Sequence, residues 1–320
     1  MSFANPLTRL LDIDHPILLA PMAGVAGGAL AAAVSEAGGL GLIGGGYGDP
    51  AWLQTELRAA GNARVGVGFI TWKLADYPQS LEQALDAAPA AVLLSFGDAA
   101  PYVDAVKKAG RLLICQVQSV AAAREAAALG ADVVVAQGGE AGGHGASRAT
   151  LPLVPAVVDA VDVPVLAAGG IADGRGLAAA LALGAQGALM GTRFYASTEA
   201  LSHARAKDRL VEASGDATVR ATLFDIVRDL PWPQPFDIRT LDNAFFARWR
   251  GREDELRAQV GEQKARYDAA AAAGDFDEAA VIAGEAADLV RAVRPAGEIV
   301  AAVMREARDA LEAGLAGWHD

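Results

Sequence analysis

The residues best suited to chemistry lie in a glycine-rich stretch at 136–145, which reads Ala-Gln-Gly-Gly-Glu-Ala-Gly-Gly-His-Gly. Five glycines within eight residues, 138–145, let the backbone pass close to a flat ligand because no side chain stands between them. His144 suits proton transfer at neutral pH, since the unperturbed pKa of histidine is about 6.5. We therefore predict that His144 is the catalytic acid or base.

The other three histidines occupy less suitable places. His15 precedes the first predicted strand, His203 lies in a helical stretch after the last one, and His319 is the penultimate residue. Only His144 belongs to a loop at the carboxyl end of a predicted strand. Glu140 in the same loop could act as a base, or it could accept a hydrogen bond that shapes the loop; both interpretations stay open.

Two further turns carry glycines that could hold an anion. Gly169-Gly170 ends the seventh predicted strand, and Gly191-Thr192 ends the eighth. Both turns lead toward a helix start, so their backbone N–H groups can point at a phosphate, and the Thr192 hydroxyl adds a donor. A single shared anion explains both pairs at adjacent strand ends. Gln137 and Gln116 offer amide donors and acceptors to the polar edge of a cofactor such as a flavin.

Positioning these groups requires a scaffold in which strand ends converge. The chain repeats a short apolar run, a glycine or polar break and an alanine-rich helical stretch, and its runs do not alternate, as in parallel strands covered on both faces. Eight such runs predict an α/β fold, a (β/α)₈ TIM barrel. The turn at 20–24 lacks the glycine fingerprint of an open dinucleotide-binding sheet. The predicted strands are 16–22, 40–46, 65–72, 91–97, 111–118, 132–138, 163–170 and 188–195; the predicted helices are 27–37, 50–60, 81–87, 101–109, 120–129, 154–161 and 175–183.

The pattern changes after the eighth run. Residues 199–273 are more charged and contain Leu-Pro-Trp-Pro-Gln-Pro at 230–235, which no helix can cross. We predict a small helical lid at 199–283, inserted after strand eight into a barrel formed by 1–198 and 284–320, with a final helix at about 296–315. Trp232, Phe245 and Trp249 are expected to pack inside the lid.

Composition excludes several classes of protein. The chain has 320 residues, 53% hydrophobic and 21% charged, enough for one large domain and a small appendage. A net charge of −12 and the absence of a run of five basic residues argue against a nucleic-acid partner. The amino terminus does not resemble a secretory signal and we see no membrane span, so we expect a cytoplasmic protein. Cys115, the only cysteine, excludes an internal disulfide and is expected to be a small buried hydrophobe.

Four segments resemble the nitronate monooxygenases, formerly called 2-nitropropane dioxygenases. They read Pro-Ile-Leu-Leu-Ala-Pro-Met-Ala-Gly at 16–24, Gln-Gly-Gly-Glu-Ala-Gly-Gly-His at 137–144, Ala-Ala-Gly-Gly-Ile-Ala-Asp-Gly-Arg at 167–175 and Ala-Gln-Gly-Ala-Leu-Met-Gly-Thr at 185–192. The Glu-Ala-Gly-Gly-His sequence is the most specific of these signals, and the resemblance covers about residues 14–200.

The resemblance implies an FMN-dependent enzyme without a metal that oxidises alkyl nitronates or nitroalkanes with oxygen to a carbonyl compound and nitrite. His144 would deprotonate a nitroalkane at its α-carbon or orient the nitronate. Met22 would lie beside the flavin, Gln137 and Gly142 would meet its ring system, and the two glycine turns would hold the phosphate. The full set assigned to the cofactor is Pro21, Met22, Ala23, Gln116, Gln137, Gly138, Gly142, Gly143, Gly169, Gly170, Leu189, Met190, Gly191 and Thr192.

Two alternative functions remain open. The same barrel and loop also resemble NAD(P)H-dependent FMN reductases that act on quinones or enoyl thioesters. A non-redox barrel that binds a phosphorylated metabolite would use the phosphate turns equally well, although sugar-phosphate chemistry usually needs a lysine or a carboxylate pair. The expected partners are a small-molecule substrate and oxygen, and we expect a monomer or a homodimer.

Overall fold

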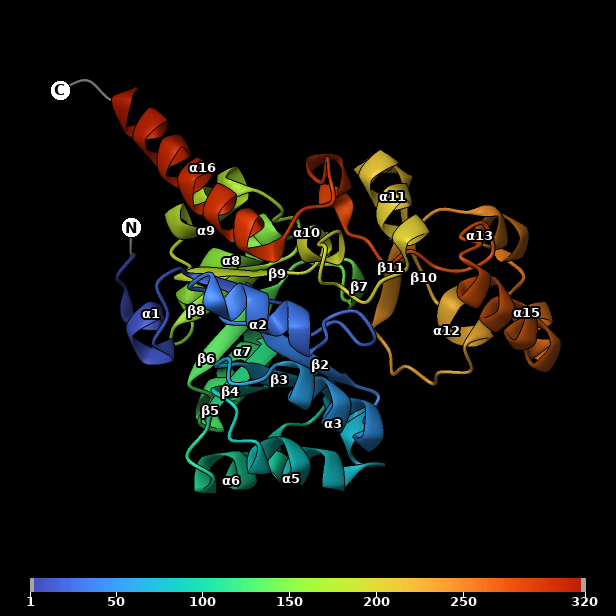
Figure 1. Cartoon of the computed structure of the whole chain (residues 1–320), viewed down its shortest axis with the longest axis horizontal. Helices are drawn as coiled ribbons and strands as arrows, with labels where there is room; N and C mark the ends of the chain where they lie inside the picture. The colour runs from blue at the N-terminus through green and yellow to red at the C-terminus, as the bar shows by residue number, and fades with distance from the viewer. Residues whose placement is uncertain (1–2, 318–320) are drawn as a thin grey trace.

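Eight parallel strands form the centre of the computed structural model, which describes residues 3–317 (Figure 1). They pair in the order β1-β9-β8-β6-β5-β4-β3-β2, and a parallel bridge between Leu18 and Leu40 joins the ends of the sheet. This nearly closed ring confirms the predicted TIM barrel. His319 lies outside the described residues. The strands are β1 (Ile17–Leu19), β2 (Leu42–Gly46), β3 (Gly66–Ile70), β4 (Ala91–Ser95), β5 (Leu112–Val117), β6 (Val133–Gln137), β8 (Val165–Ala168) and β9 (Gly187–Met190).

Helices follow the strands, and their starts show why the chain turns there. The side chains of Asp49, Ser119 and Asp173 each accept hydrogen bonds from backbone N–H groups at the start of α3, α7 and α9. The eighth predicted run was too long, because its second half forms the short helix α10 (Thr192–Tyr195). The other barrel helices are α1 (Pro6–Leu11), α2 (Gly28–Glu36), α3 (Pro50–Ala59), α4 (Thr71–Leu74), α5 (Pro78–Asp86), α6 (Ala100–Lys108), α7 (Val120–Ala128), α8 (Thr150–Val158), α9 (Gly174–Ala182) and α16 (Ala296–Ala316).

Two hydrophobic layers hold the barrel together. One cluster, with Leu93, Ile114 and Val135, fills its interior, and Leu7 and Leu11 of α1 belong to the same cluster. A larger cluster lies between the strands and the surrounding helices. Successive strand residues therefore bury side chains on opposite faces, which explains why the runs are apolar throughout. The final helix α16 packs on α9 and α2, as the predicted return of the chain to the barrel requires.

The segment after the barrel is not purely helical, so the prediction of a helical lid was incomplete. Strands β10 (Thr218–Ala221) and β11 (Asp237–Leu241) form an antiparallel sheet with β7 (Gly143–Gly145), which comes from the strand-six loop. The sequence did not reveal β7 because a glycine-rich loop carries no strand pattern. The other elements are α11 (Ala204–Glu212), η1 (Gly215–Ala217), α12 (Leu223–Val227), α13 (Ala244–Trp249), α14 (Glu253–Ala258), α15 (Val260–Ala273) and η2 (Glu285–Leu289).

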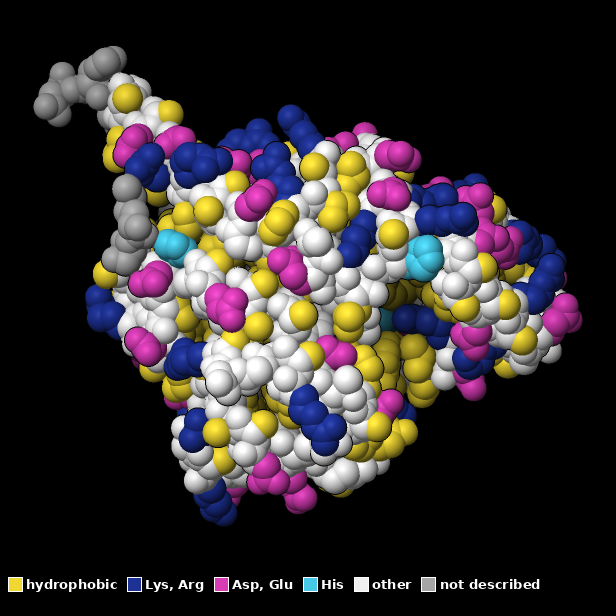
Figure 2. Space-filling view, viewed as in Figure 1, with side chains coloured by type: hydrophobic (Ala, Val, Ile, Leu, Met, Phe, Trp, Pro, Cys, Tyr) yellow, Lys and Arg dark blue, Asp and Glu magenta, His cyan; other side chains and the backbone are white. Residues whose placement is uncertain are grey.

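The inserted segment (199–283) has a hydrophobic cluster of its own, which includes Phe224, Phe245 and Trp249. Phe245 and Trp249 therefore pack inside it, as predicted. Figure 2 shows acidic and basic side chains interspersed over one face, with a hollow between the barrel and this segment. Among residues 3–317, none of the helices combines the length and apolarity needed to cross a membrane.

Candidate active site

A cavity opens at the carboxyl ends of the barrel strands, where it is bounded on the other side by the inserted segment. This is the end at which TIM-barrel enzymes carry their reactive groups. The structure brings most of the predicted site residues together around it. Those lining the cavity are Pro21, Met22, Ala23, Gln116, Gln137, Gly142, Gly143, His144, Gly169, Gly170, Leu189, Gly191 and Thr192.

Two predicted cofactor residues, Gly138 and Met190, do not line this cavity. Met190 follows Leu189 on β9, so its side chain points to the opposite face and is buried in the outer hydrophobic layer. At Gly138 a side chain would collide with the start of α8, since an added Cβ would lie 2.0 Å from Thr150 Oγ1. Gly138 therefore permits close packing of the loop on α8.

His144 is buried, with 8% of its surface exposed, and pairs with a carboxylate from the inserted segment. Its Nε2 lies 2.9 Å from both carboxylate oxygens of Asp225 on α12. Because a carboxylate only accepts hydrogen bonds, Nε2 carries the proton and Nδ1 is the basic nitrogen of the neutral ring. No residue within 3–317 hydrogen-bonds to Nδ1. Arg228 completes the chain of contacts by donating from Nη2 to Asp225 at 2.8 Å.

Aromatic side chains surround the imidazole ring. Trp232 stacks on it with ring centroids 3.3 Å apart and an angle of 7° between the planes. Phe96 meets it edge-on, and Trp232 Nε1 donates to the Tyr47 hydroxyl at 3.1 Å. We expected Trp232 to pack inside the lid; instead it lines the cavity and covers one face of His144. The rotation of the ring is thus fixed by Asp225 at its edge and Trp232 on its face.

The electrostatic environment keeps His144 neutral. Burial lowers the pKa of His144 below its usual value of 6.5, and this outweighs the opposing effect of the hydrogen bond to Asp225. Arg228 and Arg220 add smaller repulsions in the same direction. A neutral imidazole with a bonded Nε2–H is the form that accepts a proton at Nδ1.

The two predicted phosphate turns meet at one side of the cavity. Gly169 and Gly170 have φ angles of +98° and +71°, which favour glycine. Gly191 is the N-cap residue directly before α10, and a Cβ added there would contact only Ala20 Cβ at 3.5 Å and Met22 Sδ at 3.7 Å. The Thr192 Oγ1 accepts a hydrogen bond from the Gly284 N–H at 3.0 Å, which leaves its hydroxyl proton free to point elsewhere.

The remaining polar candidates have defined partners. Gln116 Nε2 donates to Ser95 Oγ at 2.8 Å, and Gln137 Nε2 donates to the His144 carbonyl at 3.0 Å. Glu140 shapes the loop, since its carboxylate accepts hydrogen bonds from both the N–H and the hydroxyl of Thr150. Cys115 is buried as predicted, and burial raises the pKa of its thiol to about 11.

Sequence reasoning missed Asp225, Arg228 and the position of Trp232. Asp225 and Arg228 stand three residues apart on α12 and its end, a spacing that places both on one helix face. That spacing also fits an ordinary solvent-exposed ion pair, so it could not identify them. Their place in the site depends on the contact between Asp225 and His144, which spans 81 residues of sequence and which no local pattern reveals.

An eight-stranded barrel with a buried histidine–carboxylate pair above its strand ends, beside glycine-bearing turns that line the same cavity, has the layout of a TIM-barrel enzyme site. A family model described as nitronate monooxygenase matches residues 4–65 and 60–306. The chain belongs to the nitronate monooxygenase family and is an oxidoreductase. Enzymes of this family are flavoenzymes in general.

Three individual similarities refine this result. The chain is 38% identical to a nitronate monooxygenase of Metarhizium robertsii, with 93% of this chain and 91% of that protein covered. It is 37% identical to (3aS,4S,5R,7aS)-5-hydroxy-7a-methyl-1-oxo-octahydro-1H-indene-4-carboxyl-CoA dehydrogenase of Mycobacterium tuberculosis, but that match spans 70% of this chain and 65% of that protein. The structure of FabK from Thermotoga maritima superposes with a TM-score of 0.89 at 34% identity, covering 98% of this chain and 99% of that one.

Proposed function

We propose that this oxidoreductase converts alkyl nitronates, and nitroalkanes after deprotonation, into a carbonyl compound and nitrite, with FMN as its cofactor and oxygen as the oxidant. The observation that carries the proposal is the charge of the cavity. Its lining is largely apolar, and among the described residues that line it Arg228, which pairs with Asp225 on one side, is the one with a permanent charge. A positive group beside a neutral base suits a substrate that is, or becomes, an anion.

The residues around the cavity fit FMN. A Cβ at Gly191 would meet side chains across the cavity and no backbone, so the glycine leaves room beside the helix start for a phosphate. Gly169, Gly170, Gly191 and Thr192 would hold the phosphate, while Pro21, Met22, Ala23, Gln116, Gln137, Gly142, Gly143 and Leu189 would surround the ring system. FMN supplies the electron transfer between nitronate and oxygen when it is bound.

The chain itself handles the proton and the negative charge. His144 Nδ1 accepts the proton from the α-carbon of a neutral nitroalkane; the C–H bond breaks and its electron pair is delocalised into the nitro group. Asp225 stabilises the imidazolium that forms, since it accepts a hydrogen bond from Nε2 at 2.9 Å. Arg228 uses Nη2 and Nε in bonds to Asp225 and to the Phe224 carbonyl, and its Nη1 has no partner among the described residues. We assign Nη1 to the oxygens of the nitronate.

A second function is favoured by the similarity to FabK and to the mycobacterial carboxyl-CoA dehydrogenase. In that case the enzyme would reduce an enoyl thioester or a quinone with NAD(P)H. The stack of Trp232 on His144 covers one face of the ring, and we take this to favour a small substrate over a bulky thioester.

Spectroscopy of the purified holoenzyme separates the two functions. We expect a flavin absorption band, and heat-released cofactor with the mass of FMN. Under anaerobic conditions an alkyl nitronate should bleach that band, and NADH should not; with oxygen admitted, nitronate should yield nitrite. Rapid bleaching by NADH with no response to nitronate would assign the chain to the reductases, and release of FAD would contradict the single phosphate cradle.

A further inference from the structure

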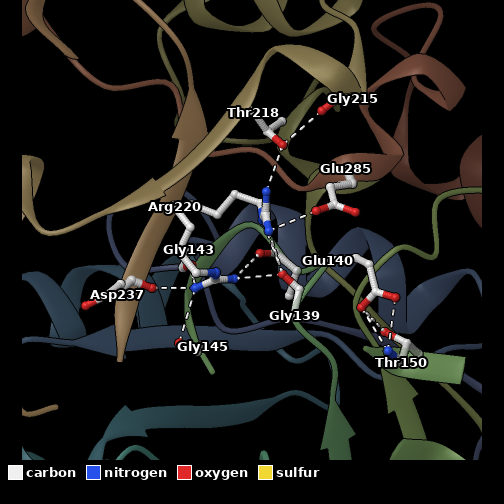
Figure 3. Close-up of polar contacts among 12 residues, drawn as sticks. Gly139, Glu140, Gly143, Gly145, Thr150, Gly215, Thr218, Arg220, Asp237 and Glu285 are labelled. Carbon is white, nitrogen blue, oxygen red and sulfur yellow. Dashed lines mark hydrogen bonds and ion pairs between the residues drawn. The ribbon is translucent and has the colours of Figure 1, made fainter. Parts of the chain in front are cut away.

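One arginine of the inserted segment lies among backbone carbonyl groups of the loop that carries His144 (Figure 3). Arg220 Nη2 donates to the carbonyls of Gly139 and Ala141, each at 3.0 Å. Its Nη1 contacts the carbonyls of Gly145 at 3.2 Å and Gly143 at 3.4 Å. A fifth carbonyl, that of Asp237 on β11, also accepts from Nη1. Four of these five oxygens come from alternate residues of one loop.

This placement is unfavourable for a cation considered alone. Within the described residues no carboxylate forms an ion pair with Arg220, and its buried Nε has no hydrogen-bond partner. It also stands directly opposite Arg239 in the β10–β11 register, although like charges across a strand pair repel. Burial lowers the pKa of Arg220 to about 10. These costs set Arg220 apart from an ordinary surface arginine, and they call for an explanation in the contacts of its guanidinium group.

The contacts of Arg220 fix the backbone on both sides of His144. Gly143 and Gly145 flank the histidine, and both of their carbonyls accept from the same guanidinium nitrogen. The His144 carbonyl between them is held by Gln137. A stretch with five glycines in eight residues loses much conformational freedom when it is ordered, so contacts of this kind are needed to hold one geometry.

The same short stretch of the inserted segment also holds the imidazole. Arg220 is the third residue of β10, and Asp225 lies five positions further along, on α12. Residues 220–225 therefore hold His144 twice: Arg220 through the loop backbone and Asp225 through Nε2. Gly145 makes room for this arrangement, since a Cβ there would lie 3.3 Å from Arg220 Nη2.

We propose that Arg220 is a positioning residue, which uses its guanidinium to gather the loop carbonyls and hold His144 Nδ1 toward the substrate. It does not contact the reacting atoms. The proposal rests on the proposed function, in which His144 is the base. Arg239 assists from the next strand, because it donates to the Gly139 carbonyl and pairs with Glu285 at 2.8 Å.

The test compares three variants of the holoenzyme: Arg220→Ala, Arg220→Lys and the control Arg111→Ala. Arg111 also binds backbone carbonyls, those of Ala88, Pro89 and Ala109, but at the amino end of the barrel. For Arg220→Ala we expect turnover of a neutral nitroalkane to fall by roughly 10- to 10²-fold, the size of effect that follows from small misplacement of a catalytic group. Guanidinium added at low millimolar concentration should restore much of the lost turnover, whereas the same concentration of sodium chloride should not. Arg220→Lys keeps the positive charge but lacks the planar guanidinium group with its several N–H donors. Its turnover should therefore lie between that of the wild type and that of Arg220→Ala.

Histidine NMR supplies a readout that does not depend on activity. In the wild type the Cε1–H signal of His144 should titrate below pH 6.5. Loss of the Arg220 charge alone would raise this pKa, so the diagnostic variant is Arg220→Lys, which keeps the charge. In that variant the titration should move toward the ordinary histidine value because the ring is no longer held in its buried site. If Arg220→Ala does not fold, both the turnover and the NMR titration are measured on Arg220→Lys. Unchanged titration in a folded variant, or an activity loss that Arg111→Ala shares and guanidinium does not relieve, would overturn the proposal. Absence of nitronate turnover in the wild type would instead refute the proposed function, and the NMR arm would still decide the role of Arg220.

Discussion

At the scale of single residues, the pair His144–Asp225 leads to a specific expectation. Asp225→Asn removes the carboxylate that accepts the Nε2 proton at 2.9 Å and that would stabilise the imidazolium. We expect turnover of a neutral nitroalkane to fall by about 10- to 10²-fold, less than the full worth of a general base. Stopped-flow or steady-state kinetics with bound FMN measures this directly.

Asp229→Asn is the matched control for that variant. Asp229 is exposed and has a φ of +57°, a conformation that asparagine tolerates well. The same chemical change four residues away should leave the rate unaltered. Equal losses in both variants would show that the effect comes from disturbing the chain after α12.

The pH dependence follows from the lowered pKa of His144. A base must be deprotonated to act, so kcat/KM for a neutral nitroalkane should be constant at neutral pH and fall as pH drops through a value below 6.5. The same protonation weakens folding in that range, because the unfolded state takes up the proton more readily than the buried ring. An inflection above 6.5 in the initial-rate profile would mean that His144 is not the titrating group.

A site residue can be predicted from the sequence when a side chain suited to the chemistry also lies in a recognisable local pattern. It cannot be predicted when its place depends on a contact between distant parts of the chain. The place of His144 in the cavity could be predicted because it lies among glycines after a predicted strand end; its role as the base stays a prediction. Asp225 and Arg228 could not be predicted, since Asp225 meets His144 across 81 residues of sequence and Arg228 contacts the pair only through Asp225. Trp232 lies in a proline-rich turn. That pattern predicts the absence of a helix, but it does not indicate that the indole ring stacks on His144.

At the scale of elements, the turn before α10 carries the next prediction. Gly191→Leu places a side chain into the cavity beside Ala20 and Met22, where we expect the phosphate of FMN. FMN binding should weaken by at least about tenfold while the melting temperature of the flavin-free protein stays close to that of the wild type. Fluorescence titration with FMN measures the affinity.

Gly261→Leu controls for the added side chain. Gly261 lies on α15, where an added Cβ meets nothing within 4 Å. Its FMN affinity should equal that of the wild type. Full FMN occupancy in a folded Gly191→Leu protein would place the phosphate elsewhere.

Element prediction succeeded for the barrel because parallel strands buried on both faces leave continuous apolar runs, and alanine-rich helical stretches separate them. It failed for β7, β10 and β11. The β7 strand consists of Gly143, His144 and Gly145, and becomes a strand only because β11 pairs with it. Such a strand is a product of tertiary contact and has no local signal.

At the scale of the whole molecule, the barrel supplies the glycine turns proposed to hold the cofactor, and the inserted segment supplies the groups that contact His144, the proposed base. Asp225, Arg228 and Trp232 all reach His144 or its partner from that segment. The segment thus completes the cavity over a barrel fold that many enzymes with different reactions share.

The most direct test of the central claim compares His144→Ala with the wild type on two forms of one substrate. A neutral nitroalkane must lose its α-proton, whereas a preformed nitronate has already lost it. We expect the variant to lose about 10²- to 10⁴-fold in turnover of the neutral form, much less on the nitronate, and to keep its FMN. Equal losses on both forms, or no loss on either, would contradict the assignment of His144 as the base.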